Sequence, residues 1–463
     1  MSLIKSISGI RGTIGGKTGD SLTPVDIVKF AAAFGTWVMH KTGNNKLIIG
    51  RDARPSGQMV SNLVVGTLQG LGIDIVDLGL STTPTVEVAV PEEGAGGGII
   101  LTASHNPVQW NALKLLNHKG EFISAADGAE VLQIAEEESF EFASVKKLGS
   151  YTKDNSYIQK HIEMILALPL VDVEAIRQRN FSVILDCVNS TGGISLPPLL
   201  EALGIHQVKE LYCDPNGEFP HNPEPLPENL THICAEMEKG NYDLGIVVDP
   251  DVDRLALICE DGTPFGEEYT LVAVSDYILS QNKGNTVSNL SSTRALRDIT
   301  EKHQGDYQAS AVGEVNVVNK MKEIGAVIGG EGNGGIIYPE LHYGRDALVG
   351  IALFLTHLAK FGKSASMLRA TYPNYQISKN KIELTPEIDV DLVLEEVKNK
   401  YAKQPINTID GVKIEFEREW VHLRKSNTEP IIRIYAESEF LATADNLANK
   451  IIDDIKEIIS AKA

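Results

Sequence analysis

One serine in a short turn has the chemistry and the setting of a nucleophile. Ser104 lies in residues 102–107, directly after the apolar run 98–101. Such a run is typical of a buried strand, and the Asn106–Pro107 step disfavours an immediate helix. We therefore expect Ser104 on an exposed turn at the end of a strand. Because a serine there is more often a turn or cap residue, its interpretation depends on other clusters in the chain.

Three aspartates at alternate positions follow a second apolar run, residues 244–248. In an extended segment, Asp249, Asp251 and Asp253 project to one side and repel one another. A divalent cation is the simplest group that neutralises them, and ligands that are all oxygens favour Mg²⁺ over zinc. The alternative is a solvated acidic loop in which Arg254 supplies the counter-charge.

Two further loops carry groups that suit a phosphorylated sugar. The glycine-rich segment 329–335 lets the backbone approach a ligand, and its Glu331 and Asn333 could bind vicinal hydroxyls. Residues 424–433 gather arginine, lysine and small polar side chains, and guanidinium binds phosphate oxygens in a bidentate way. The alternatives are an ordinary glycine turn and an exposed turn whose charges face water.

The four clusters, in this order, resemble the motifs of the α-D-phosphohexomutase superfamily over essentially the whole chain. The motifs read TASHNP, DPDVDR, EGNGG and RKSNTEP. The resemblance implies an α/β fold of three related mixed α/β domains and a smaller C-terminal α+β domain around a central cleft. We expect these domains at residues 1–150 (phosphoserine), 151–255 (metal binding), 256–370 (sugar recognition) and 371–463 (phosphate binding).

The same resemblance implies a role for each matching residue. Ser104 would be the phosphoserine and, with Asp249, Asp251 and Asp253, would hold Mg²⁺. Three further catalytic positions are Arg11, Lys114 and His105. The substrate-binding positions are Arg254, Glu331, Asn333, Arg424, Ser426, Asn427, Thr428 and Arg433.

Lys114 matches a family lysine that is placed for acid–base work. It could accept a hydroxyl proton only if desolvation or nearby cations such as Arg11 lower its pKa from the usual value near 10.4. The alternative is an ordinary surface lysine.

The sugar loop departs from a common bacterial pattern. Many bacterial relatives have Ser-Gly-His where this chain has Asn333-Gly334-Gly335. The loop resembles archaeal-type phosphoglucosamine mutases instead, which favours interconversion of hexosamine 6- and 1-phosphates, with hexose 1,6-bisphosphate as activator. A phosphoglucomutase/phosphomannomutase is the alternative. A silent sugar-phosphate binding protein is a third possibility, against which the intact Ser104, aspartates and Lys114 argue.

Composition limits the classes of partner. With 463 residues and 43% hydrophobic content the chain can form several cores, and its net charge of −20 argues against nucleic acid or anionic membrane as a partner. The four cysteines form no C-x-x-C pair, which is typical of reduced thiols. The N-terminal segment has no apolar signal core, and no run elsewhere approaches the length of a membrane span. We expect a cytoplasmic monomer or homodimer that acts on a small sugar phosphate.

Overall fold

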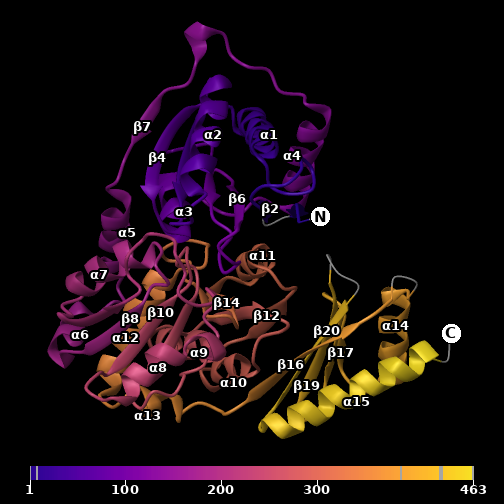
Figure 1. Cartoon of the computed structure of the whole chain (residues 1–463). Helices are drawn as coiled ribbons and strands as arrows, with labels where there is room; N and C mark the ends of the chain where they lie inside the picture. Colours follow the sequence, from indigo (N-terminus) through magenta and orange to yellow (C-terminus); the bar gives the residue numbers. More distant parts are fainter. Residues whose placement is uncertain (1, 7–8, 386–387, 427–430, 461–463) are drawn as a thin grey trace. The chain divides into compact units, whose positions relative to one another are not determined.

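The structure is a computed structural model that describes residues 2–6, 9–385, 388–426 and 431–460 (Figure 1). The chain forms two compact units: residues 1–278 with 333–369, and residues 279–332 with 370–463. The mixed α/β architecture expected from the sequence is confirmed in both units.

The first domain is built on a seven-stranded mixed sheet. In order across the sheet, its strands are β1 (Ile4–Ser6), β2 (Gly9–Thr13), β6 (Trp110–Leu116), β5 (Gly97–Leu101), β3 (Lys46–Arg51), β4 (Asp74–Leu80) and β7 (Tyr151–Lys153). Strands β5, β3, β4 and β7 run parallel, while β1, β2 and β6 extend the sheet in antiparallel fashion. Every residue of β5 is buried, as expected for a parallel strand covered on both faces.

Helices cover both faces of this sheet. One core contains apolar side chains of α1 (Pro24–Thr42), α2 (Gly57–Gly70) and α4 (Ala125–Glu137), and another contains those of α3 (Thr83–Glu92). Helix α1 begins with a capping box in which Thr23 and Asp26 satisfy each other's backbone N–H groups, and it ends at Gly43 in the left-handed region. A short 3₁₀ turn, Val145–Lys147, precedes β7.

The second domain has a four-stranded sheet in the order β11 (Leu255–Cys259), β10 (Leu244–Val248), β8 (Ser182–Asp186) and β9 (Gln207–Leu211). Its helices are α5 (Tyr157–Leu166), α6 (Val173–Arg179), α7 (Gly192–Ala202) and α8 (Thr231–Glu238), with a 3₁₀ turn at Pro227–Asn229. Strands β10 and β11 are antiparallel, so the aspartate loop between them is a tight reversal at one edge of the sheet. The first unit also contains β15 (Gly335–Ile337), α12 (Ala347–Phe361) and α13 (Ala365–Arg369), while α9 (Glu267–Gln281) runs from the first unit into the second.

The second unit contains two sheets. Strands β13 (Tyr307–Ser310), β12 (Asn285–Asn289) and β14 (Ala326–Glu331) run parallel and alternate with α10 (Ala295–Lys302) and α11 (Glu314–Ile324). The antiparallel C-terminal sheet has the order β16 (Gln376–Glu383), β20 (Ile431–Ser438), β19 (Trp420–Lys425), β18 (Val412–Glu415) and β17 (Ile406–Asn407). Helices α14 (Val390–Lys400) and α15 (Leu441–Ser460) share its core, and Figure 1 shows α15 lying along this sheet.

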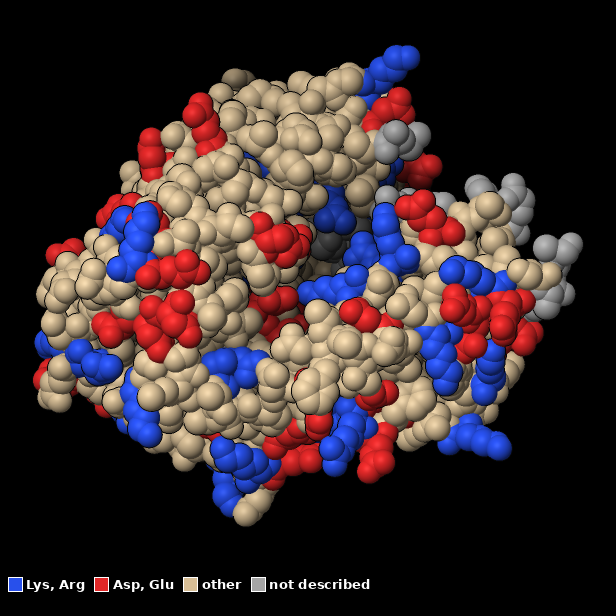
Figure 2. All heavy atoms as spheres, turned by 60° about the horizontal axis from the view of Figure 1, so that its bottom comes forward, with Lys and Arg blue, Asp and Glu red and all other residues tan. Residues whose placement is uncertain are grey.

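Three features of the structure bear on the expectations from composition: the distribution of charged side chains, the state of the cysteines and the apolar character of the helices. Acidic and basic side chains are interspersed over the face drawn in Figure 2. All four cysteines lie in the described segments and are free thiols. A bilayer could not be crossed by any helix in the described segments, because none combines the necessary length with the necessary apolar character.

A buried histidine links the two sheets of the second unit. His422 on β19 has its Nδ1 atom 2.9 Å from the Ser291 hydroxyl and its Nε2 atom 2.6 Å from the Asp410 carbonyl oxygen. A neutral imidazole satisfies both contacts by donating to the carbonyl and accepting from the hydroxyl. Burial lowers the pKa of His422 from 6.5 to about 4, which keeps the ring neutral in the folded protein.

This shift predicts a pH dependence of stability. Because the folded-state pKa is the lower one, the stability present above pH 6.5 is lost as the pH falls toward 4. His422→Gln retains a donor and an acceptor but cannot be protonated. We expect urea unfolding to show a smaller loss of stability for H422Q than for the unaltered chain between pH 7 and pH 4.5, by up to about 3 kcal/mol. Equal losses in the two proteins would contradict this assignment.

Candidate active site

The Ser104 loop begins where strand β5 ends, as the sequence predicted. The expectation of an exposed turn is wrong, because the loop packs against the aspartates and only 7% of Ser104 is exposed. The Thr102 hydroxyl donates to Asp52 Oδ2 (2.7 Å) and accepts from the Ser104 backbone N–H (2.9 Å). Ser104 has a φ of 49°, a left-handed conformation that costs a non-glycine residue about 1 kcal/mol. The loop must therefore be held in this shape by its surroundings.

Arg54 supplies that support, and sequence reasoning missed it. Its guanidinium donates to the carbonyl oxygens of Ser104, Asn106 (2.7 Å), Pro107 (2.7 Å) and Trp110 (3.1 Å). Its Nε atom lies 2.9 Å from Asp52 Oδ2, and both side chains of this ion pair are fully buried. A signal was present, because Asp52 and Arg54 directly follow the apolar strand β3, as Ser104 follows β5.

The loop that contains the three aspartates, residues 249–254, is stabilised by hydrogen bonds from its own backbone to the Asp249 carboxylate. Asp249 Oδ1 accepts hydrogen bonds from the backbone N–H groups of Asp253 (3.1 Å) and Arg254 (3.2 Å). Val252, buried and β-branched, has a φ of 62°. Such a residue is strained in the left-handed region, so this stiff loop stores backbone strain beside Ser104.

The loop brings its three carboxylates to Ser104. Ligand oxygens of Asp249, Asp251 and Asp253 lie within 4.8 Å of one another, and all three residues are fully buried. The Ser104 hydroxyl donates to Asp249 Oδ2 at 2.8 Å. Burial, together with the charges of Asp253 and Asp251, raises the pKa of Asp249 well above its usual range. The predicted nucleophile and the predicted metal ligands therefore form one cluster.

The residues of this cluster fit a divalent cation. Within the described part of the chain, Asp251 Oδ1 and Asp253 Oδ1 are buried and accept no hydrogen bond. A buried carboxylate oxygen without a donor is costly, and a hard cation bound by oxygen ligands would satisfy both atoms. The donor set of three carboxylates and a serine oxygen suits Mg²⁺.

Lys114 on β6 reaches the same carboxylates. Its Nζ atom lies 2.7 Å from Asp251 Oδ2 and 3.6 Å from Asp253 Oδ2. Burial alone would lower the pKa of Lys114, but the charges of Asp251 and Asp253 outweigh it and raise this pKa above its usual value. The lowering that we set as a condition for a basic Lys114 is not found, because the nearest charges are carboxylates. Lys114 is a cation in this arrangement.

Two further side chains at the aspartates were missed by the sequence analysis. Arg345, which precedes α12, donates to Asp253 Oδ2 at 2.8 Å. The Thr83 hydroxyl, at the start of α3, donates to Asp251 Oδ2 at 2.5 Å. Neither lies in a segment with a recognisable motif, and both are more than 90 residues from the aspartate that they contact.

The structure also places the other predicted residues of this region. His105 Nδ1 lies 3.3 Å from Ser104 Oγ, and burial with the charge of Arg254 lowers the pKa of His105 to about 2, so its ring is neutral. Arg254 pairs with Glu224 at 3.2 Å. Arg11 on β2 is registered with Ala112 on β6, so Arg11 and Lys114 project from the same face of the sheet.

Asn333 belongs to the first unit and packs beside the aspartate loop. Its Oδ1 atom accepts from the backbone N–H of Gly335 (3.2 Å). Gly334 accepts from the backbone N–H of Leu255 (3.1 Å), and a Cβ on Gly334 would lie 2.2 Å from the Leu255 carbonyl oxygen. Glycine is therefore required at 334 by a close backbone approach as well as by its φ of 83°.

The remaining predicted residues lie in the second unit. Glu331 Oε1 accepts from the Asn289 amide (2.8 Å) and from the Gly313 backbone N–H (3.1 Å). Arg424 on β19 is registered with Arg433 on β20, so their side chains share one face, and Arg424 Nε pairs with Asp410 at 2.9 Å. The Ser426 backbone N–H donates to the Ile431 carbonyl oxygen (3.0 Å), while Asn427 and Thr428 lie outside the described residues.

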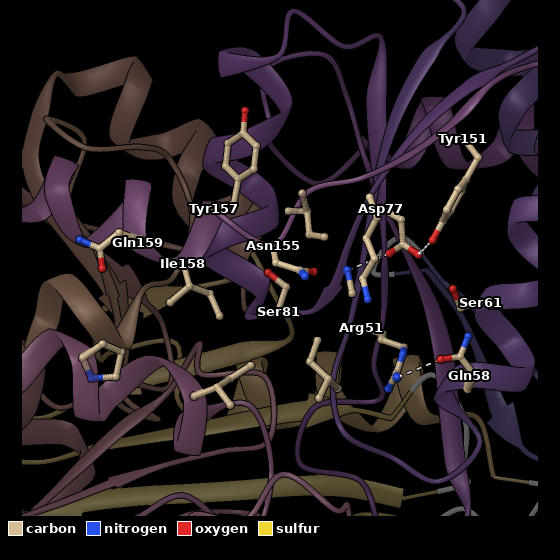
Figure 3. Close-up of a pocket in the computed structure, with 16 residues that line it drawn as sticks. Arg51, Gln58, Ser61, Asp77, Ser81, Tyr151, Asn155, Tyr157, Ile158 and Gln159 are labelled. Carbon is tan, nitrogen blue, oxygen red and sulfur yellow. Dashed lines mark hydrogen bonds between the residues drawn. The ribbon is translucent and has the colours of Figure 1, made fainter.

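A cavity of about 620 Å³ lies elsewhere in the first unit (Figure 3). Arg51 contacts Gln58 there (3.2 Å), and the Tyr151 hydroxyl donates to Asp77 (2.8 Å). Of the predicted site residues that the structure describes, none lines this cavity. Cavity volume alone therefore does not locate the chemistry of this chain.

Known protein families match the chain along most of its length. Models of the phosphoglucomutase/phosphomannomutase alpha/beta/alpha domains I, II and III match residues 3–142, 157–262 and 266–375, and the model of the C-terminal domain matches residues 381–454. All four matches occur in the order that the sequence motifs implied.

Individual relatives cover nearly the full chain. A phosphoglucomutase/phosphomannomutase of Thermococcus kodakarensis is 35% identical over 92% of this chain and 94% of its own. A phosphoglucosamine/phosphogalactosamine mutase of Sulfurisphaera tokodaii is 30% identical over the whole of both chains. A crystal structure of a phosphoglucomutase/phosphomannomutase family protein from Burkholderia thailandensis aligns with a TM-score of 0.84 at 26% identity, covering 99% of this chain and 98% of that one.

The aspartate cluster makes a testable prediction about cation binding. Asp251→Asn removes one carboxylate, and we expect the affinity for Mg²⁺ in isothermal titration calorimetry to fall at least about tenfold. Asp261→Asn is the matched control, because Asp261 is exposed and accepts hydrogen bonds from the backbone N–H (3.0 Å) and hydroxyl (2.6 Å) of the turn residue Thr263. Unchanged affinity in D251N would exclude this cluster as the Mg²⁺ site.

Proposed function

This chain belongs to the phosphoglucomutase/phosphomannomutase family, and on that basis we propose that it interconverts the 6-phosphate and 1-phosphate of a hexosamine, with glucosamine phosphate preferred. The chain is a phosphohexomutase, an isomerase that works by phosphoryl transfer. The contact of 2.8 Å between Ser104 Oγ and Asp249 carries the proposal, because a serine hydroxyl beside three buried carboxylates supports a nucleophile next to a bound cation.

The reaction runs through Ser104 in two balanced half-reactions. In the first, the phosphorus–oxygen bond of phosphorylated Ser104 breaks, a bond forms to a free sugar hydroxyl oxygen, that hydroxyl loses its proton, and Ser104 Oγ gains one. In the second, the other phosphoryl group of the bisphosphorylated sugar passes to Ser104 Oγ, the serine loses its proton, and the released sugar oxygen gains one. A hexose 1,6-bisphosphate activator would charge Ser104 by the second half-reaction alone.

The side chains around Ser104 suit this chemistry. Phosphoryl transfer depends chiefly on positioning and on neutralising negative charge. Lys114 and Arg345 provide two buried cations at the carboxylates, and Arg54 fixes the loop that carries the serine. Asp249, Asp251 and Asp253 would hold Mg²⁺, which supplies positive charge beside the transferring group.

We assign Lys114 the proton that the released sugar oxygen gains. Its Nζ atom is a buried ammonium group within the cluster, and a cationic lysine is an acid rather than a base. Asp249 Oδ2 accepts the hydrogen bond of Ser104 and so orients the nucleophilic oxygen.

In this proposal, the second unit binds the phosphate that does not react. Arg424 and Arg433 project from one face of two paired strands, and although Asp410 pairs with Arg424, two guanidinium groups on one face suit the oxygens of a phosphate. The sugar must turn around between the two half-reactions, so the same arginines would bind a 6-phosphate in one half-reaction and a 1-phosphate in the other.

The preference for an aminosugar rests on the Glu331 to Gly335 loop and on one group of relatives. The full-length relative from S. tokodaii carries the name phosphoglucosamine/phosphogalactosamine mutase. The T. kodakarensis relative, named phosphoglucomutase/phosphomannomutase, supports the alternative of a neutral hexose substrate. Replacing a hydroxyl by an amine at one sugar carbon changes the free energy of the transition state by only a few kcal/mol. The aminosugar and neutral-hexose hypotheses are therefore distinguished by the ratio of kcat/KM for the two kinds of substrate.

Loss of the Ser104 hydroxyl should abolish both phosphorylation and turnover. Incubation with glucose 1,6-bisphosphate should add about 80 Da to the intact mass of the unaltered chain and nothing to Ser104→Ala. We expect turnover to fall at least about a thousandfold. Ser104→Gly should behave identically while relieving the left-handed backbone, which separates chemistry from loop strain. Ser139→Ala, at an exposed serine, is the control; full turnover in S104A would exclude the phosphoserine route.

Substrate choice is tested by parallel measurements of kcat/KM. With Mg²⁺ and bisphosphate present, we expect glucosamine 6-phosphate to exceed glucose 1-phosphate and mannose 1-phosphate by at least about tenfold, which equals about 1.4 kcal/mol of transition-state discrimination. Equal or higher values for the neutral hexoses would assign the chain to the phosphoglucomutase/phosphomannomutase alternative. No turnover with any of the three would favour a silent binding protein.

A further inference from the structure

A second cluster of titratable side chains lies in the first unit, and the Ser104 chemistry does not use it. His161 on α5 and His342, before α12, both direct Nε2 at one oxygen, Asp346 Oδ2, at 3.0 and 3.3 Å. His161 and Asp346 are fully buried, and only 10% of the His342 side chain is exposed. The other oxygen of Asp346 caps helix α12 by accepting from the backbone N–H groups of Leu348 and Val349.

The outer nitrogen of each imidazole also faces an oxygen. His161 Nδ1 lies 3.0 Å from the Thr85 hydroxyl, and His342 Nδ1 lies 3.4 Å from Glu87 Oε2. Both partners belong to α3. Gly344 permits the approach of Glu87, because a Cβ at 344 would lie 1.9 Å from Glu87 Oε2. An imidazole whose second nitrogen is held by a hydroxyl or carboxylate is the usual arrangement of a metal-binding histidine.

His342 faces a carboxylate with each of its two ring nitrogens, although a neutral imidazole carries only one N–H. A neutral imidazole has one N–H, so it can donate to Asp346 or to Glu87 but not to both. Its other nitrogen then turns a lone pair toward a carboxylate. An additional proton, on the ring or on the facing carboxyl group, could resolve this conflict, and so could a metal ion between Nε2 and Asp346. With the metal, Nδ1–H donates to Glu87 in His342 and to Thr85 in His161, and every group is satisfied.

We propose that His161 Nε2, His342 Nε2 and Asp346 Oδ2 bind a divalent transition-metal ion of the zinc class. Bonds of about 2.0–2.2 Å in a tetrahedron place neighbouring ligand atoms about 3.3 Å apart, which agrees with the two distances to Asp346. The three ligand atoms lie within 4.8 Å of one another. Imidazole ligands select zinc over Mg²⁺, so this site differs in chemistry from the aspartate cluster.

The site would act as a structural cross-link. Its ligands come from α5 of the second domain and from the segment before α12, and their supporting partners Thr85 and Glu87 come from α3 of the first domain. Buried structural metal sites contribute directly to folding free energy. The ion would therefore join three segments that are distant in sequence within one compact unit.

Metal content of the full-length protein tests the proposal. After exposure to Zn²⁺ and gel filtration, the unaltered chain and D251N should each retain one zinc, while His342→Asn should retain none; D251N separates this site from the aspartate cluster. His206→Asn, at an exposed histidine, is the control and should retain the ion. Co²⁺ should give the strong visible bands of a tetrahedral site in the unaltered chain, D251N and H206N, and should not give them in H342N. Zinc should also raise the Tm of the unaltered chain and of H206N but leave that of H342N unchanged.

Two results would overturn the proposal. The first is an unaltered chain that retains no zinc and gives only the weak cobalt spectrum of an oxygen-ligand site; this result needs no variant and does not depend on the folding of H342N. The second is equal zinc retention in H342N and H206N.

Discussion

Three carboxylates buried in one short loop can stay together only if positive charge surrounds them. Lys114 comes from a strand of the first domain, and Arg345 comes from the segment before α12. The aspartate loop belongs to the second domain, so the ion pairs that neutralise it also join these parts of the first unit. A buried charge without its partner is strongly destabilising, so the charge balance of the aspartate cluster and the packing of the unit depend on each other.

The positions of the reactive loops could be predicted from the sequence because each follows a short apolar run. Ser104 comes three residues after β5 ends at Leu101, and Asp249 comes directly after β10 ends at Val248. The groups that hold these loops could not be predicted in the same way. Arg345 contacts Asp253 across 92 residues of sequence, and only the folded chain brings the two together.

The protonation state of Lys114 illustrates the same limit. From the sequence, a basic Lys114 requires that desolvation or nearby cations such as Arg11 lower its pKa, whereas the fold places two carboxylates at 2.7 and 3.6 Å from its Nζ atom, and these raise the pKa. A pKa depends on distances of a few ångströms, and a motif specifies which residue types are present without fixing those distances. The strand register does bring Arg11 to the same face as Lys114, in agreement with the resemblance.

Arg54 holds the serine loop through the carbonyl oxygens of Ser104, Asn106 and Pro107, so the loop is fixed in position. In the proposed reaction, Ser104 stays in place and must receive its second phosphoryl group from a sugar that has rotated. The bisphosphorylated intermediate therefore has to remain captive for longer than its rotation takes. Retention of the intermediate, more than the speed of either chemical step, then determines whether one catalytic cycle ends with a recharged enzyme.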